Sequence, residues 1–194
     1  MDKDFLIKTY AQMYGPEAGP WNLGAANKYL EYRFADFFEK HFEVVSGNNL
    51  CNVGIGAGAW DRYLSYQLKG GTLTSIDIDT LCCRQLKEGL ICEENPNSVE
   101  VICGDVMTLD YPEMFDIVTM VGSTHKESEL GSVILEKIMS FVKKGGCLYY
   151  QSLFSDLQVE EIKEIAVKNG LRVVVCEEEI KYGFNCQYIK MVKE

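Results

Sequence analysis

Short apolar runs alternate along the chain with longer segments in which apolar residues recur every three or four positions, and this alternation begins near residue 50. A continuous apolar run of about four to eight residues is typical of a buried strand, whereas the longer spacing predicts one apolar face of a helix. Five such runs occur, at residues 50–54, 73–78, 99–103, 115–121 and 147–153. Strands that alternate with helices predict a mostly parallel sheet with helices on both faces.

The helices expected between these strands are placed by their apolar faces and their ends. After the first strand, apolar residues at 60, 63, 64 and 68 have helical spacing. The segment Lys126 to Lys143 has the same spacing and is expected to stop at Gly145-Gly146. A further helix is expected to begin near Ser155, because Ser155 and Gln158 have the spacing of a capping box, and to end at Asn169-Gly170.

The last part of the chain departs from this alternation. Residues 171–179 and 186–192 both have the pattern of strands, and only the short segment 180–185 separates them. That gap is too short for a crossover helix, so the two strands are expected to pair antiparallel. The predicted fold class is therefore α/β, with a doubly wound, mostly parallel seven-stranded sheet that ends in an antiparallel strand.

The first part of the chain has a different pattern. Residues 1–46 are interpreted as two helices separated by the turn-forming segment 15–20, and the second helix is expected from about Gly24 to His41. We expect residues 1–46 to form a helical cap or lid. Residues 47–194 are expected to form a Rossmann-like domain that binds the ligand, and the two parts together make one structural unit.

Composition and charge exclude several classes of protein. The length of 194 residues, with 47% hydrophobic residues, suits one globular domain. No apolar run approaches the roughly 18 residues of a membrane span, and Phe5-Leu6-Ile7 is too short for a signal peptide, so a cytoplasmic protein without a membrane partner is expected. The eight cysteines include no Cys-x-x-Cys pair, and no metal site is predicted. The net charge of −10 argues against a nucleic-acid partner, and no oligomeric state is predicted.

The most informative motif is a strand that runs directly into Gly54-Ile55-Gly56-Ala57-Gly58 and then into a helix. Glycine adopts positive φ angles and lets a ligand approach the backbone. The start of a helix offers unpaired N–H groups and the positive end of a dipole. This turn therefore suits a nucleotide-like ligand with polar or anionic atoms.

Acidic residues follow the second and third predicted strands, at the edge of the sheet where the glycine turn also lies. Asp77 comes 19 positions after Gly58, and an acid at that place in this architecture accepts hydrogen bonds from ribose hydroxyls. The alternative for Asp77 or Asp79 is to cap the next helix; we assign Asp77 to the ribose and Asp79 to the cap. Asp105 either accepts a hydrogen bond from an exocyclic amine, such as that of adenine, or is an ordinary turn residue.

Taken together, five segments resemble the class I S-adenosylmethionine-dependent methyltransferases. They are residues 52–58, 76–78, 104–106, 115–118 and 144–148. The resemblance covers about residues 50–194 and implies an enzyme that binds S-adenosylmethionine and releases S-adenosylhomocysteine. The glycine turn of this family usually follows Asp or Glu. Here Asn52 stands at that place, and an amide does not form an ion pair with the ammonium group of the cofactor.

The resemblance also implies roles for individual residues in cofactor binding. Gly54, Gly56 and Gly58 would line the methionine part, Asp77 would hold the ribose, Ile78 would pack on the adenine, Asp105 would reach the adenine amine, and Val121 would lie near the sulfonium. Asn52 and Val106 belong to the same cofactor-binding segments.

A small molecule is the expected methyl acceptor. The motif for methylating exocyclic amines of nucleic acids, Asn or Asp followed by Pro-Pro and an aromatic residue, is absent after the fourth strand. Tyr10, Tyr14 and Trp21 are candidates for contact with a flat or apolar acceptor, with ordinary packing as the alternative. Methyl transfer mainly requires the acceptor to lie in line with the departing sulfur. For a hydroxyl acceptor a general base assists, and His125 is the candidate, with a surface loop residue as the alternative.

Two other functions fit parts of the sequence. Gly54, Gly56 and Ala59 satisfy the looser fingerprint of a nicotinamide dinucleotide-binding domain, and Asp77 fits its ribose acid. The chain lacks room for a separate substrate domain and ends in an antiparallel hairpin, so we favour a methyltransferase over an NAD(P)-dependent oxidoreductase. A non-catalytic nucleotide-binding protein with the same fold is the third alternative, which the sequence does not exclude.

Overall fold

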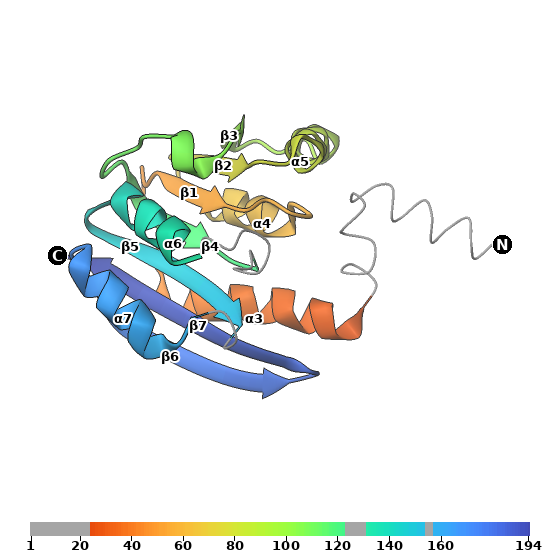
Figure 1. Ribbon diagram of the computed structural model, residues 1–194. Helices are drawn as coiled ribbons and strands as arrows, with labels where there is room; N and C mark the ends of the chain where they lie inside the picture. The colour runs from red at the N-terminus through yellow and green to blue at the C-terminus, as the bar shows by residue number, and fades with distance from the viewer. Residues whose placement is uncertain (1–23, 123–130, 154–156) are drawn as a thin grey trace.

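The computed structural model describes residues 24–122, 131–153 and 157–194, and their strands form a single seven-stranded sheet (Figure 1). The strands are β1 (Leu50–Val53), β2 (Thr72–Asp77), β3 (Ser98–Cys103), β4 (Phe115–Met120), β5 (Val142–Leu153), β6 (Leu171–Lys181) and β7 (Phe184–Lys193). The helices are α3 (Ala25–His41), α4 (Ala59–Gln67), α5 (Thr80–Cys92), α6 (Gly131–Phe141) and α7 (Val159–Lys168), with the short 3-10 helix η1 (Val106–Thr108).

The strand order is β3-β2-β1-β4-β5-β7-β6, with parallel pairing from β3 to β5. The predicted doubly wound α/β sheet is confirmed, and β6 and β7 pair antiparallel as expected. The antiparallel strand β7 does not end the sheet, however, because it lies between β5 and β6. Burial explains this order: β7 carries the buried residues Tyr188, Ile189 and Met191, whereas β6 carries three consecutive glutamates, Glu177–Glu179, and takes the edge.

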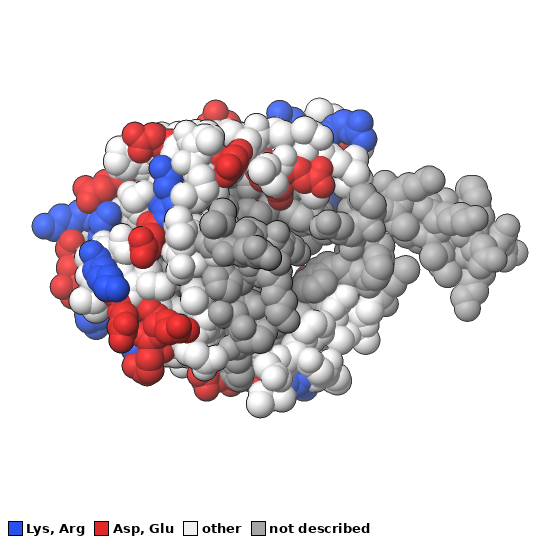
Figure 2. Space-filling model, in the orientation of Figure 1, with Lys and Arg blue, Asp and Glu red and all other residues white. Residues whose placement is uncertain are grey.

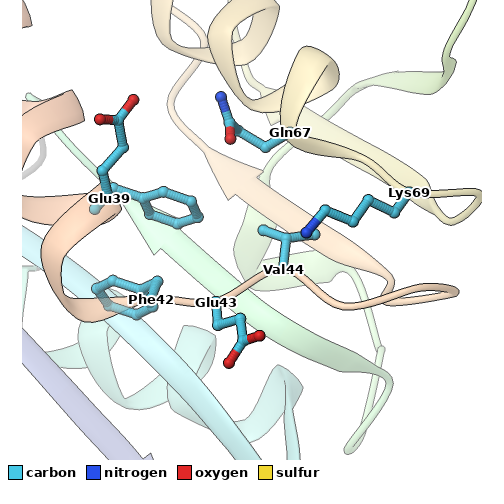
Figure 3. A pocket seen from close by; sticks show the side chains of 7 residues that line it. Glu39, Phe42, Glu43, Val44, Gln67 and Lys69 are labelled. Carbon is cyan, nitrogen blue, oxygen red and sulfur yellow. The ribbon is translucent and has the colours of Figure 1, made fainter.

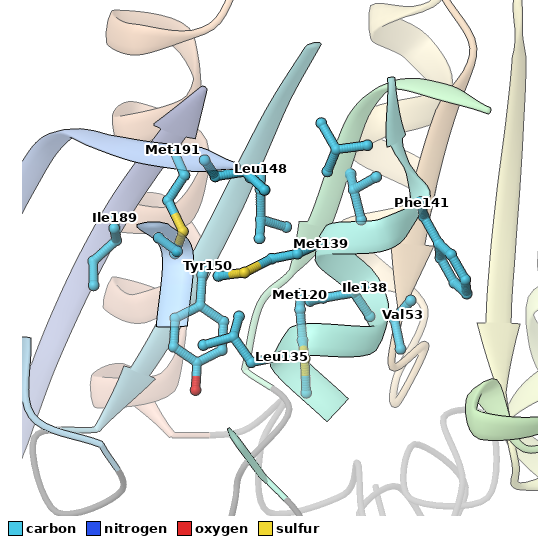
Figure 4. Close-up of a cluster of buried hydrophobic side chains, with 14 of the residues drawn as sticks. Val53, Met120, Leu135, Ile138, Met139, Phe141, Leu148, Tyr150, Ile189 and Met191 are labelled. Carbon is cyan, nitrogen blue, oxygen red and sulfur yellow. The ribbon is translucent and has the colours of Figure 1, made fainter. Parts of the chain in front are cut away.

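Two hydrophobic cores lie on opposite faces of the sheet. On one face, α3 and α4 pack on the strands through large side chains such as Phe37, Phe38 and Leu64. On the other face, α6 and α7 cover the strands, and Figure 4 shows Leu135, Ile138 and their neighbours from α6 against β4, β5 and β7. Burying a large apolar side chain stabilises a fold by about 2 kcal/mol, so both layers are held firmly.

Two details differ from the sequence-based expectation. The helix expected up to Lys143 ends at Phe141, and Gly145-Gly146 lie inside β5, where the register with β4 shifts, and not at a helix terminus. The predicted capping box between Ser155 and Gln158 is wrong, because α7 begins only at Val159. Gln158 is its N-cap, and the Glu161 side chain accepts a hydrogen bond from the Gln158 N–H at 2.9 Å.

The predicted second helix is confirmed as α3, which begins at Ala25 and ends at His41. Its buried face belongs to the same core as β1, β5 and β7, so it is packed into the domain. None of the helices in the described ranges is both long enough and apolar enough to cross a membrane.

Candidate functional site

The glycine turn connects β1 to α4 at the carboxyl edge of the sheet. Gly54, Gly56 and Gly58 have φ angles of 91°, 50° and 74°, all in the region that favours glycine. Gly58 is the N-cap of α4, so the helix starts directly from the turn. Apart from its chain neighbours, a Cβ atom at Gly56 would meet no atom of the described residues within 4 Å, which leaves the backbone open to a ligand on that side.

Asp77 holds this turn against the end of β2. Its Oδ2 accepts hydrogen bonds from the N–H groups of Ile55 at 2.7 Å and Gly56 at 3.1 Å, and its Oδ1 accepts one from Asp79 N–H at 2.8 Å. An ionised carboxylate offers about four lone-pair sites and three are used here, so about one remains for a further donor such as a hydroxyl. The side chain of Asp79 caps α5 by accepting from Leu81 N–H, which confirms the predicted cap.

The next residues along this edge were predicted to receive an adenine ring. Ile78 is 71% exposed, which leaves an apolar surface beside Asp77. Asp105 is exposed, and its Oδ1 accepts from Met107 N–H and so caps η1, while Val106 is buried. The turn role of Asp105 is thus structural fact, and its contact with an adenine amine stays a prediction.

Val121 follows β4 and is buried at the same edge of the sheet. The N–H of the next residue, Gly122, donates to Gln151 Oε1 at 2.8 Å, and Gln151 on β5 is itself buried. Gln151 therefore fixes the backbone that carries Val121. Gln151 is not predicted from the sequence, because a glutamine inside a predicted strand gives no local signal of such a contact.

A buried polar network lies beneath the glycine turn. Asn52 donates through Nδ2 to Gly54 O at 3.1 Å and to Asp61 Oδ1 at 2.9 Å, and its Oδ1 accepts from Thr119 Oγ1 at 2.8 Å. Trp60 Nε1 donates to Thr119 Oγ1 at 3.1 Å. Asn52, Asp61 and Thr119 are fully buried. Sequence analysis named Asn52 but neither Asp61 nor Thr119.

Burial strongly affects the ionisation of Asp61. Loss of solvent raises the pKa of its carboxyl to about 7, and the nearby negative charge of Asp77 adds to the rise. The proximity of the Ser75 hydroxyl and the hydrogen bond from Asn52 oppose this rise. A buried acid that titrates near neutral pH beside a predicted ligand site is a candidate functional group.

Several predicted residues lie outside the described residues. These are Tyr10, Tyr14 and Trp21 in the N-terminal segment and His125 after β4. Their roles stay predictions. Within the described ranges, no group of three or more His, Cys, Asp or Glu side chains is arranged to hold a metal ion.

A cleft of about 180 Å³ lies elsewhere, at the amino ends of the strands (Figure 3). Glu39, Phe42, Glu43, Gln67 and Lys69 are among its lining residues, and they precede β1 or β2 in the chain. Ligands of open α/β sheets bind outside the carboxyl ends of the strands, where the glycine turn lies. This cleft is therefore separate from the candidate cofactor site.

Comparison with known families agrees with this geometry. Residues 51–146 match the family of the methyltransferase domain, a range that contains the glycine turn, Asp77 and Asp105. Residues 51–146 are a methyltransferase domain, the chain has the fold of the class I S-adenosylmethionine-dependent methyltransferases, and its cofactor is S-adenosylmethionine. The open turn, the exposed Ile78 and the carboxylate of Asp77 fit such a ligand. A search of curated proteins found no match.

Solved structures share the fold at low sequence identity. A magnesium protoporphyrin IX methyltransferase from Synechocystis PCC 6803 with bound S-adenosylmethionine is 13% identical, with a TM-score of 0.72 over 100% of this chain and 98% of that chain. A Burkholderia thailandensis 1,6-didemethyltoxoflavin-N1-methyltransferase is 15% identical, with a TM-score of 0.66 over 98% and 88%. The [4+2]-cyclase SpnF is 16% identical, with a TM-score of 0.70 over 83% and 80%.

Proposed function

We propose that this methyltransferase transfers the methyl group of S-adenosylmethionine directly to a small-molecule acceptor. The observation that carries the assignment of the site is the glycine turn, which Asp77 holds open at the carboxyl ends of adjacent strands. When bound there, S-adenosylmethionine supplies a methyl group that its sulfonium already activates. The protein's task is then mainly to orient the acceptor in line with the departing sulfur, and orientation contributes at best about 7–11 kcal/mol.

The proposed cofactor contacts follow the edge of the sheet. Gly54, Gly56 and Gly58 line the methionine part, with Asn52 beneath them. Asp77 accepts a hydrogen bond from a ribose hydroxyl with the lone pair on Oδ1 that its three backbone donors leave available. The exposed side chain of Ile78 covers the adenine ring, Asp105 and Val106 border the ring, and Val121 lies near the sulfonium.

Charge and the structural neighbours support a small acceptor. Lys and Arg side chains are scattered among acidic ones on the face shown in Figure 2, and the net charge is −10, so no basic surface for a phosphate backbone is visible there. Two of the neighbours named above are methyltransferases named for small molecules, magnesium protoporphyrin IX and 1,6-didemethyltoxoflavin. For a hydroxyl acceptor, His125 is the proposed base.

The proposed N-terminal cap would cover the acceptor. Because α3 is packed into the domain, the part of residues 1–46 that is available to cover an acceptor is the segment before it, with Tyr10, Tyr14 and Trp21. We propose that these aromatic side chains contact the acceptor.

Calorimetric titration tests the cofactor site. We expect S-adenosylmethionine and S-adenosylhomocysteine to bind and NAD and NADP not to bind. Asp77→Ala removes acceptors from the turn and from the ribose, so affinity should fall at least tenfold, and Asp77→Asn, which keeps one acceptor oxygen, should lose less. Binding of NAD or NADP alone would instead support the oxidoreductase. If neither kind of ligand binds, the result would favour a protein whose site at the glycine turn does not bind a cofactor.

A further inference from the structure

The polar network beneath the glycine turn has a fixed direction. An indole N–H is only a donor, so Trp60 must donate to Thr119 Oγ1. Of the two acceptors near the Thr119 hydroxyl, Asn52 Oδ1 at 2.8 Å is closer than Cys51 O at 3.5 Å and takes the proton. This orients the amide so that Nδ2 points to Gly54 O and Asp61 Oδ1. Asp61 is the acceptor at which this chain of hydrogen bonds ends.

Three neighbouring strands contribute to this network at one level of the sheet. Asn52 on β1 is in register with Ser75 on β2 and with Thr119 on β4, and all three side chains are fully buried. Asp61, in the first turn of α4, lies against this row. Asp61 Oδ2 and Ser75 Oγ have no hydrogen-bond partner within the described part of the chain. The Ser75 hydroxyl is nevertheless near enough to Asp61 to lower the pKa of its carboxyl.

The buried carboxyl of Asp61 therefore accepts a hydrogen bond from Asn52, and Asn52 in turn holds the glycine turn by donating to Gly54 O. We propose that Asp61 is a positioning residue for the cofactor. Asp61 orients Asn52, and its buried negative charge favours the cationic S-adenosylmethionine over S-adenosylhomocysteine. The inference rests on the proposed function, since it requires the methionine part of the cofactor at the glycine turn. The two ligands share their amino and carboxyl groups and differ in the charge on sulfur.

The charge of Asp61 depends on few other groups. Among the described residues, Asp77 raises its pKa, and the nearby thiol of Cys51, on the opposite face of β1, stays protonated because burial raises the pKa of that thiol far above its usual value. Thr119 and Trp60 carry no charge. With a pKa of about 7, Asp61 is about half protonated at neutral pH, so a nearby cation drives its proton off.

Proton release on binding is the direct test. Calorimetry at pH 7 in two buffers of different ionisation enthalpy measures the protons released with each ligand. We expect S-adenosylmethionine to release up to about 0.5 proton more than S-adenosylhomocysteine in the wild-type protein. In Asp61→Asn this difference should vanish. At pH 8 the preference for S-adenosylmethionine over S-adenosylhomocysteine should fall about fivefold in that variant.

Two further variants separate charge from structure. Asp79→Asn removes a negative charge at the same edge and keeps its capping oxygen, so it should retain the proton difference. The double variant Asn52→Asp/Asp61→Asn returns the charge to the strand and should restore most of the preference for S-adenosylmethionine. A merely structural role of Asp61 would leave both the proton difference and the preference unchanged.

Equal proton release with the two ligands in the wild-type protein would overturn the inference without any variant. Retention of the difference in Asp61→Asn would overturn it as well. A wild-type protein that binds neither ligand would instead contradict the proposed cofactor site, so the two failures are distinct.

The free protein offers an independent check of the titration. The folded pKa of Asp61 is raised to about 7 from an ordinary value of 3.8, so the folded state binds the proton more tightly than the unfolded state does. Stability from this group is present below about pH 4 and is lost as pH rises towards 7. Urea unfolding should show this decline in the wild-type protein and a flatter profile in Asp61→Asn.

Discussion

At the scale of single residues, the side chains at the ends of the strands were predicted from the sequence, and the one beneath them was not. Asp77 ends an apolar strand and Asp79 comes two residues later, which marks them as edge residues. Asp61 lies inside a helix, where a charged residue is usually taken as surface. A signal was present, because Asp61 has helical spacing with Leu64 and Leu68, and both are buried. An acid on an apolar helix face either is buried with that face or interrupts it, and Asp61 is buried.

The glycine turn allows a prediction that separates stability from binding. Alanine at Gly56 or Gly58 is strained, because both have positive φ, and this costs about 1–2 kcal/mol. At Gly58 the added Cβ would also lie 3.3 Å from Leu86 Cδ1, whereas at Gly56 it would meet open space. Urea unfolding should therefore show the larger loss for Gly58→Ala, and calorimetry should show a loss of cofactor affinity for Gly56→Ala. The reverse order of stabilities would contradict the expected crowding against Leu86.

At the scale of elements, apolar spacing predicts most helices and strands, but it does not predict the order of the strands in the sheet. The hairpin of β6 and β7 was predicted because its connection is short. Which of the two pairs with β5 was not predicted, although the run Glu177–Glu179 on β6 favours the sheet edge, because the prediction used only local spacing and not burial across the sheet. The same holds for Gly145-Gly146, which have the composition of a helix end but serve as an irregularity in β5.

Helix α3 is attached to the outer strand β6 by a charged cluster. Arg33 donates to Glu177 Oε2 at 2.9 Å and to Glu179 Oε2 at 3.2 Å, pairs with Asp36, and lies 5.1 Å from the centre of the Tyr188 ring. The Arg33 side chain is 13% exposed, so these pairs are poorly screened by solvent.

Removing the centre of this cluster should loosen α3. Arg33→Ala leaves Glu177 and Glu179 without their shared cation, and we expect the free energy of unfolding to fall by about 2 kcal/mol. Lys163→Ala is the matched control, since it breaks the solvent-exposed pair with Glu160 and should cost less than about 0.5 kcal/mol. Urea denaturation of both variants measures the contrast. Equal losses would show that the cluster contributes no more than an ordinary surface pair.

At the scale of the whole molecule, residues 24–194 contain the sheet, both cores and the glycine turn. The predicted fold class and cofactor followed from the order of motifs along the chain. The acceptor did not, because the residues expected to contact it lie in a segment whose pattern is aromatic but has no spacing specific to one substrate.

Deletion of residues 1–22 tests the proposed cap at this scale. Since α3 and the sheet retain their contacts, the shortened protein should unfold cooperatively and bind S-adenosylmethionine within about twofold of the full chain. Turnover of an acceptor found by screening should fall at least tenfold. Full turnover by the shortened protein would disprove the cap.

The place of β7 between β5 and β6 has a consequence for biosynthesis. A ribosome makes β6 before β7, yet β6 reaches the sheet only through β7. Until β7 emerges, β5 presents an unpaired edge of strand hydrogen-bonding groups, which is a site for wrong association. The nascent chain therefore completes its sheet late. A good yield of folded enzyme then requires that the β5 edge be protected from other strands during synthesis.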